Sequence, residues 1–282
     1  MSFFFGIVIA LGYLLSHYLN NPIILYGSII ASVVMNIWAY WFSDKSVIAM
    51  TKAEEVSFKQ APELHRIVEN LSITAGLPKP KVYIIHDNAP NAFATGRNKK
   101  NAVVAVTTGL LEILEKKELE GVIAHELAHI GNNDMLIATV SVVLVGMITA
   151  ASDILLRGSI FGDSRSDSGT GGGNALVLIV GLVLALLMPV VGTLIRMAIS
   201  RKRELLADAT GAMITRYPKG LASALEKIHH YPKKMRNANH ATAHMFIANP
   251  FGFKRAATYV NRLFNTHPPA ELRIQLLKEM DL

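Results

Sequence analysis

The chain contains no cysteine among its 282 residues. This absence excludes disulfide bonds and all thiolate chemistry, whether a cysteine nucleophile or a cysteine ligand in a metal site. It agrees with a reducing compartment, although missing cysteines alone do not identify one. Any metal site or catalytic nucleophile in this chain must therefore be built from other side chains.

Charged residues are also scarce. They make up 17% of the chain, against 51% hydrophobic residues, and the mean hydropathy is +0.34. Because a soluble domain carries about a quarter charged residues, this composition favours a membrane protein. The net charge is +7, and the basic residues lie next to apolar runs and on short turns such as Arg97–Lys100. This placement favours contact with anionic lipid over nucleic-acid binding.

Apolar residues are concentrated in four runs, which are Phe3–Leu19, Ile23–Phe42, Met135–Leu156 and Ala175–Ile195. Since a helix needs about 20 apolar residues to cross a hydrocarbon core, we expect four transmembrane helices. For the third run, which contains Asp153, a buried or re-entrant helix is the alternative. We expect the first run to be a retained anchor, because no basic residue precedes it and Ser16-His17-Tyr18 is a poor signal-peptide cleavage site.

The segment His125-Glu126-Leu127-Ala128-His129 is the most informative in the chain. On a helix, His125 and His129 lie one turn apart on one face, which places two imidazoles side by side as zinc ligands. Glu126 can then reach a zinc-bound water and act as general base. Chance would give about 0.016 such matches in a chain of this composition. The alternative is a surface helix with two unrelated histidines.

Two histidines leave a catalytic zinc site one protein ligand short, with the fourth position kept for water. Glu204 and Asp208 are the only acidic residues between Asp167 and Glu226, and they lie one helical turn apart just past the fourth apolar run. Glu204 is a candidate ligand, and Asp208 is a candidate hydrogen-bond partner for the far nitrogen of a metal-bound histidine. Spacing alone favours equally a solvated helix face on which both pair with neighbouring basic residues.

Three further histidines have weaker patterns. His240 and His244 are also four residues apart, but no acidic residue lies between them, so a polar surface is favoured over a second metal site. His267 precedes Pro268-Pro269 at the start of a predicted helix, Ala270–Met280. It is a candidate donor to the oxyanion of a tetrahedral intermediate. The alternative is an ordinary helix entry with proline at its first positions.

The polar segments predict an α+β fold, mostly helical, with a zincin-like catalytic domain and a short β-sheet. Periodicity indicates a helix at Glu54–Leu71, strands at Lys81–His86 and Ala102–Thr107, and the composition of Asn88–Gly96 is typical of a turn. The helix that carries His125 follows the second strand.

The chain is expected to contain four regions: residues 1–43 with two transmembrane helices, 44–134 with the first half of the catalytic domain, 135–195 with two more spans, and 196–282 with the second half. The Gly/Ser-rich stretch at 157–174 lacks the ending of a phosphate-binding loop, so we interpret it as a linker. Basic residues follow the second and fourth spans, at Lys45, Lys52, Lys59, Arg196, Arg201, Lys202 and Arg203. By the positive-inside rule, both polar regions are expected in the cytoplasm.

Together these segments resemble the HtpX family of integral-membrane zinc metalloproteases, the bacterial relatives of the CAAX prenyl endopeptidase, over nearly the whole chain. The matching motifs are Asn91–Gly96, Val104–Leu111, His125–His129, Ser200–Asp208 and Thr266–Pro269. The resemblance implies Glu204 as the third ligand, one Zn²⁺ per subunit and a cytoplasm-facing site in the bacterial inner membrane. It also implies turnover of misfolded or damaged membrane proteins under stress. The Gly-rich insert Ser159–Gly173 matches no motif of the family.

Metal-assisted peptide hydrolysis is the expected mechanism, with Glu126 passing a proton from water to the leaving amine. We expect strand Ala102–Thr107 to bind the substrate as an added strand, which gives sequence-tolerant recognition. A selective processing protease is the alternative enzyme. A non-catalytic zinc-binding scaffold or chaperone is disfavoured because only three ligands are visible, and a transporter because no span has a central charge. Oligomeric state and cleavage preference are not predicted.

Overall fold

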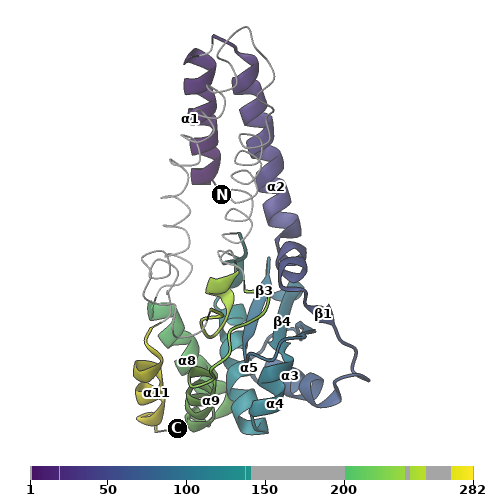
Figure 1. The fold of residues 1–282 in the computed structure, drawn as a ribbon, viewed down its shortest axis with the longest axis vertical. Coiled ribbons are helices and arrows are strands. Elements are labelled where there is room, and N and C mark those ends of the chain that lie inside the picture. The colour runs from purple at the N-terminus through teal and green to yellow at the C-terminus, as the bar shows by residue number, and fades with distance from the viewer. Residues whose placement is uncertain are drawn as a thin grey trace. The chain divides into compact units, whose positions relative to one another are not determined.

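A computed structural model describes residues 2–18, 20–136, 138–140, 201–238, 242–251 and 268–281. The predicted spans beyond residue 140, the 157–174 segment, His240 and His267 lie outside the described residues. The chain divides into two compact units, one of residues 1–42 and 143–194 and one of residues 43–142 and 195–282 (Figure 1). The boundaries predicted for the four regions stay predictions.

The first unit contains α1 (Ser2–Tyr18) and most of α2 (Ile23–Thr51), which continues past the unit boundary at Phe42. Asn20 turns the chain between them with a φ of 50°, and the Ile23 N–H donates to Asn21 Oδ1 over 3.0 Å. Among the described residues, no helix alone has the length and hydropathy of a membrane span. The parts of α2 on either side of a 68° bend, Ile23–Met35 and Tyr40–Thr51, meet that test only together.

The second unit is built on a four-stranded sheet with the order β1-β2-β4-β3. Its strands are β1 (Glu54–Glu55), β2 (Lys81–Ile85), β3 (Ala92–Gly96) and β4 (Ala102–Thr107). Central β4 pairs in parallel with β2 and antiparallel with β3, and all six of its residues are buried. Burial on both faces explains its unbroken apolar sequence. The predicted strands at Lys81–His86 and Ala102–Thr107 are thereby confirmed, the first ending one residue earlier.

Two predicted elements are wrong. The predicted turn Asn88–Gly96 contains β3, because pairing with β4 overrides the weak strand preference of its alanine and glycine residues. The predicted helix Glu54–Leu71 starts too early: Glu54 and Glu55 pair with β2, and α3 runs from Pro62 to Thr74. Proline at the start of α3 explains the boundary, since its missing N–H needs no partner there.

Further helices of the second unit are α4 (Thr108–Ile113), α5 (Lys116–Gly131), α8 (Arg201–Thr215), α9 (Pro218–His229) and α11 (Ala270–Lys278), with short 3₁₀ turns η1 (Lys99–Asn101) and η2 (Ala243–Met245). Helices α4 and α5 of this unit contact the sheet. Helix α5 is central and packs against α3, α8, α9 and β3. The observed fold is therefore mostly helical with a small mixed sheet, as predicted.

A capping box fixes the start of α5. The Glu115 N–H donates to the Glu118 carboxylate over 2.8 Å, and Ser223 and Lys227 of α9 donate to the same carboxylate over 2.6 and 2.7 Å. Burial opposes ionisation of Glu118, but these hydrogen bonds outweigh it and hold its pKa below the ordinary value. The contacts join the first turn of α5 to α9 and so set the direction of the helix.

Glycine allows α5 to approach α9 closely. A Cβ on Gly121 would lie 2.7 Å from the backbone nitrogen of Leu221, whereas one on Gly131, in the same helix, would meet only Leu77 Cδ1 at 3.8 Å. We expect Gly121→Ala to lower the free energy of unfolding by about 1–3 kcal/mol through overpacking. Gly131→Ala, the control, should be neutral or stabilising. Urea unfolding of both variants tests this, and equal stability of the two would contradict it.

Candidate metal centre

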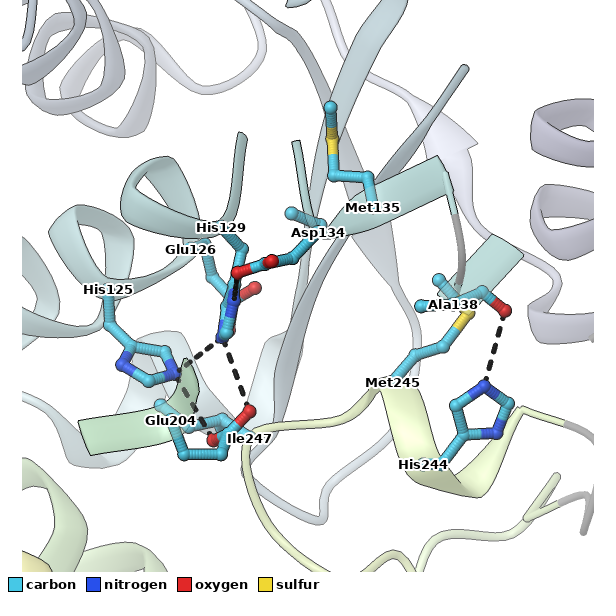
Figure 2. Close-up of a pocket in the computed structure, with 11 residues that line it drawn as sticks. His125, Glu126, His129, Asp134, Met135, Ala138, Glu204, His244, Met245 and Ile247 are labelled. Atoms are coloured by element: carbon cyan, nitrogen blue, oxygen red, sulfur yellow. Dashed lines mark hydrogen bonds and ion pairs between the residues drawn. The ribbon is translucent and has the colours of Figure 1, made fainter. Parts of the chain in front are cut away.

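Helix α5 presents the two histidines of the motif to Glu204 of α8 (Figure 2). The Nε2 atoms of His125 and His129 are 3.2 Å apart, and the Glu204 carboxylate oxygens lie 3.8 Å from the first and 3.5 Å from the second. Four ligands around a tetrahedral zinc ion with bonds of 2.0–2.1 Å stand about 3.3 Å from one another. The donor types and their spacing therefore fit zinc.

Most of the side chains at this cluster are buried, and His129 is partly exposed. His125, Glu126 and Glu204 are each less than 5% exposed, and the pocket between them has a volume of about 40 Å³. The alternative of a solvated helix face for Glu204 and Asp208 is thus wrong, because both carboxylates point into the protein. Within the described residues, His125, His129 and Glu204 form the only cluster suited to a metal ion.

Glu126 lies in the same pocket, beside the ligands but outside their cluster. Its burial raises the pKa to about 7, and the negative charge of Glu204 acts in the same direction against the opposing charges of His129 and Arg273. A carboxyl group with a pKa near the working pH is suited to accept and return a proton. Glu126 thus lines the same pocket as the three possible ligands, and its role as general base stays a prediction.

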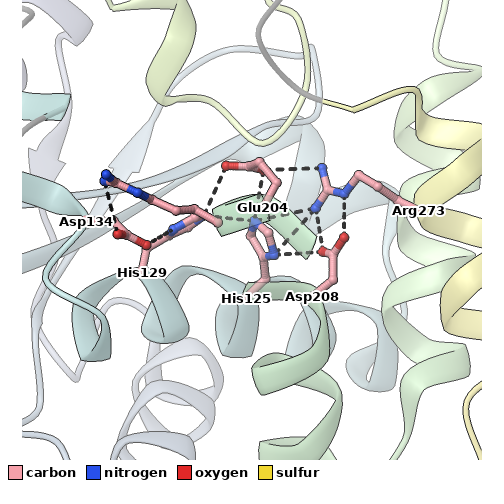
Figure 3. Close-up of polar contacts among 7 residues, drawn as sticks. His125, His129, Asp134, Glu204, Asp208 and Arg273 are labelled. Carbon is pink, nitrogen blue, oxygen red and sulfur yellow. Dashed lines mark hydrogen bonds and ion pairs between the residues drawn. The ribbon is translucent and has the colours of Figure 1, made fainter. Parts of the chain in front are cut away.

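The far nitrogen of His125 is held by Asp208, at 2.9 Å from Nδ1 to Oδ1 (Figure 3). Burial lowers the pKa of His125 to about 4, so the imidazole is neutral at pH 7. A hydrogen bond from Nδ1–H to Asp208 leaves the lone pair of Nε2 directed at the ligand cluster. This is the arrangement expected for Asp208 from its spacing.

Arg273 of α11 binds both Asp208 oxygens, with Nε at 2.7 Å and Nη2 at 2.6 Å. Its Nη1 lies 3.8 Å from Glu204, and its side chain is only 2% exposed. Burial would raise the pKa of Asp208, but the charge and hydrogen bonds of Arg273 dominate and bring it to about 2. Asp208 is therefore a permanent carboxylate held by a bidentate partner.

Negatively charged side chains also act on the other histidine, His129. Burial would lower the pKa of His129, but its hydrogen bond to Asp134 and the charges of Glu204 and Glu126 outweigh it and raise the pKa to about 9. The site thus attracts a cation. A divalent metal ion would compensate the negative charge of the same carboxylates and would displace the proton from the imidazole.

Sequence reasoning missed two contributors, Arg273 and Asp134. One signal for Arg273 was available, since it lies four residues before Leu277 on the apolar face of its helix, and both are buried.

The prediction that His244 lies on a polar surface was wrong. This residue is 3% exposed and lines the metal pocket. Its Nε2 lies 3.3 Å from the Ala138 carbonyl oxygen. The predicted role of His267 lies outside the described residues.

Replacing Asp208 tests its link to the metal. We expect Asp208→Asn to weaken zinc binding about ten- to a hundredfold, because it removes the charge that fixes the His125 ring. Competition with a chromogenic chelator measures the change. The exposed Asp281→Asn is the matched control, and unchanged zinc affinity in Asp208→Asn would show that the carboxylate serves only packing.

Comparison with known proteins identifies the family. The profile of peptidase family M48 matches residues 58–281. The chain belongs to peptidase family M48. A protease HtpX homolog of Pyrococcus furiosus is 48% identical over 285 residues, covering 99% of this chain and 93% of the relative. A protease HtpX homolog of Caldanaerobacter subterraneus subsp. tengcongensis is 46% identical, covering 98% and 91%. The predicted HtpX resemblance is confirmed, and M48 membership makes the chain a metalloprotease.

The fold of this M48 chain also resembles that of a solved structure, S. mikatae Ste24p, with a TM-score of 0.52 and 18% sequence identity. The match covers 96% of this chain but only 62% of the Ste24p chain, so the chain spans about three fifths of that protein's length. At this identity, the likeness concerns the fold alone.

Proposed function

We propose that this metalloprotease is a zinc-dependent endopeptidase that hydrolyses misfolded or damaged membrane proteins at the cytoplasmic face of a bacterial inner membrane, as part of quality control under stress. The apolar composition and the basic residues after the predicted spans support the location. Substrates are expected to be recognised by their lack of structure rather than by a fixed sequence.

The observation that carries the catalytic part is the buried group of His125, His129 and Glu204 with Glu126 beside it. A structural zinc site uses four protein ligands and needs no base, whereas the described cluster offers three ligands and an adjacent carboxyl group. Three protein ligands leave one position for water or substrate. This composition favours a catalytic site over a scaffold.

When bound by these three residues, zinc supplies a Lewis acid that polarises the scissile carbonyl and lowers the pKa of its water. Glu126 takes a proton from the attacking water and delivers it to the leaving amine. Asp208 and Arg273 keep His125 in one tautomer throughout, because both remain charged and buried. The burial of His125, Glu126 and Glu204 strengthens these interactions, because charges attract more strongly away from water.

The expected role of Ala102–Thr107 as substrate-binding strand is wrong, because β4 pairs on both sides, with β2 and β3. Strand β3 is one of the two edge strands of the sheet, and its Ala94 lines the metal pocket. The Ile247 N–H already donates to the Ala92 carbonyl over 3.0 Å. A substrate strand is therefore proposed along the Ala94–Gly96 part of β3.

Backbone methylation of a peptide substrate tests this pairing. N-methylation at alternate residues should raise KM at least about tenfold where the N–H faces β3, since a strand pair loses one of its hydrogen bonds there. Methylation at the residues between them should change KM little. A flat response along the peptide would exclude strand pairing.

The activity is tested with the full chain purified in mild detergent. Casein should be cleaved, cleavage should stop on chelation, and added zinc should restore it. A two-span membrane protein destabilised by a core substitution should be cleaved faster than its folded parent. Bound zinc without cleavage of any of these substrates would contradict the proposed function and favour a scaffold.

The absence of cysteine makes the location directly testable. Single cysteines at exposed Ile23 and Lys100 can be labelled in intact cells with a membrane-impermeant maleimide. We expect Ile23→Cys to react in intact cells and Lys100→Cys only after lysis. Reaction of both before lysis would contradict the cytoplasmic assignment.

A further inference from the structure

Each histidine of the cluster has its own carboxylate partner, and each carboxylate has its own arginine. Asp208 and Arg273 serve His125, as described above. His129 Nδ1 lies 3.2 Å from Asp134 Oδ2, and the other oxygen of Asp134 lies 3.4 Å from Arg203 Nη1. In Figure 3, Asp134 lies on the opposite side of the cluster from Asp208 and Arg273.

The turn that ends α5 places Asp134. Asn133 adopts a left-handed conformation with a φ of 60°, which asparagine tolerates better than most residues. The chain therefore folds back, and the Asp134 N–H donates to the His129 carbonyl oxygen over 3.1 Å. Backbone and side chain of Asp134 thus both contact His129, and the residue is only 9% exposed.

Arg203 connects this turn to α8. It directly precedes Glu204, so one turn of α8 carries both a metal ligand and the cation that contacts Asp134. Its side chain is 29% exposed, against 2% for Arg273. Because a partly exposed ion pair is weaker than a buried one, Arg203 should contribute less than Asp134 itself.

We propose that Asp134 is a positioning residue that holds the His129 ring with Nε2 directed at the metal, and that Arg203 keeps Asp134 in place. The inference rests on the proposed zinc-dependent function. A carboxylate at Nδ1 fixes the tautomer and orientation of the ring and raises its strength as a ligand. His129 is 17% exposed on its side chain, more than His125 at 1%, so it has more freedom that needs restraint.

The zinc dissociation constant, measured by chelator competition, tests the proposal. Asp134→Ala should raise it about ten- to a hundredfold, and Asp134→Asn, which retains an acceptor oxygen, should raise it less. Arg203→Met should raise it only severalfold, and its effect should largely vanish when Asp134 is already alanine. Exposed Lys202→Met, on the same turn, is the matched control and should bind zinc like the parent.

Two further readouts separate positioning from a structural role. The visible absorption spectrum of the Co²⁺-substituted protein should change in Asp134→Ala, and kcat at saturating zinc should fall more than KM changes. Zinc affinity within twofold of the parent, with an unchanged cobalt spectrum, would overturn the proposal even if Asp134→Ala were less stable. If Asp134→Ala fails to fold, the zinc affinity and cobalt spectrum of Asp134→Asn test the proposal in its place. A parent chain that binds no zinc would instead contradict the proposed function.

Discussion

Glu126→Gln is expected to reduce kcat/KM for casein cleavage by about 10²–10⁴-fold while the chain keeps one zinc ion. The amide has nearly the same shape as the carboxylate but cannot accept the proton of the attacking water. Zinc binding should persist because Glu126 lies outside the cluster of His125, His129 and Glu204. Steady-state kinetics and zinc quantification on the same preparation measure both quantities.

The matched control is Glu112→Gln, an exposed position on α4, which should retain full activity. Stability should not fall in Glu126→Gln, since burial already disfavours the charged carboxylate. Activity of Glu126→Gln within tenfold of the parent would remove Glu126 as the base. Loss of zinc together with activity would instead make it a determinant of metal binding.

Arg273→Met should lower the free energy of unfolding by about 3–5 kcal/mol, because it leaves buried carboxylates without their cation. Methionine keeps much of the apolar stem, so the loss reports the missing guanidinium rather than an empty space. Asp208 loses two hydrogen bonds, and Glu204 loses a charge 3.8 Å away. Urea unfolding in mild detergent measures the change.

A second substitution distinguishes electrostatics from packing. Adding Asp208→Asn to Arg273→Met removes one unpaired charge and should recover part of the lost stability. Lys278→Met on the exposed side of α11 removes a surface ion pair with Glu226 and should cost less than about 1 kcal/mol. Equal losses for Lys278→Met and Arg273→Met would show that burial of the Arg273 guanidinium has no special role.

Sequence patterns correctly predicted α5 and β4, whose structure depends on residues that are close together in the chain. The His125–His129 spacing needs only a helix, and α5 carries its own capping box. Strand β4 has the continuous apolar sequence of a doubly buried strand. These features were readable because the residues that determine them are neighbours in the chain.

Contacts between residues that are far apart in the sequence could not be predicted from such local patterns. Strand β3 is formed from alanine, threonine, glycine and one phenylalanine, and it becomes a strand through its pairing with β4. Arg273 looks like one more basic residue on a surface helix until Asp208, 65 positions away, is brought against it. The pairing of Asp134 with Arg203 likewise exists only once α5 and α8 pack together.

The placement of the ligands on α5 and α8 has a consequence for the lifetime of the protein. His129 and Glu204 stand on either side of residues 135–195, so their coordination of one ion would act as a removable crosslink in a chain that has no cysteine for a permanent one. At free zinc about 1,000 times above the dissociation constant, such binding adds about 4 kcal/mol to the stability of the folded state. Zinc starvation would therefore withdraw activity and stability together. A copy without its zinc ion would then both lack activity and unfold more easily than one with the ion bound.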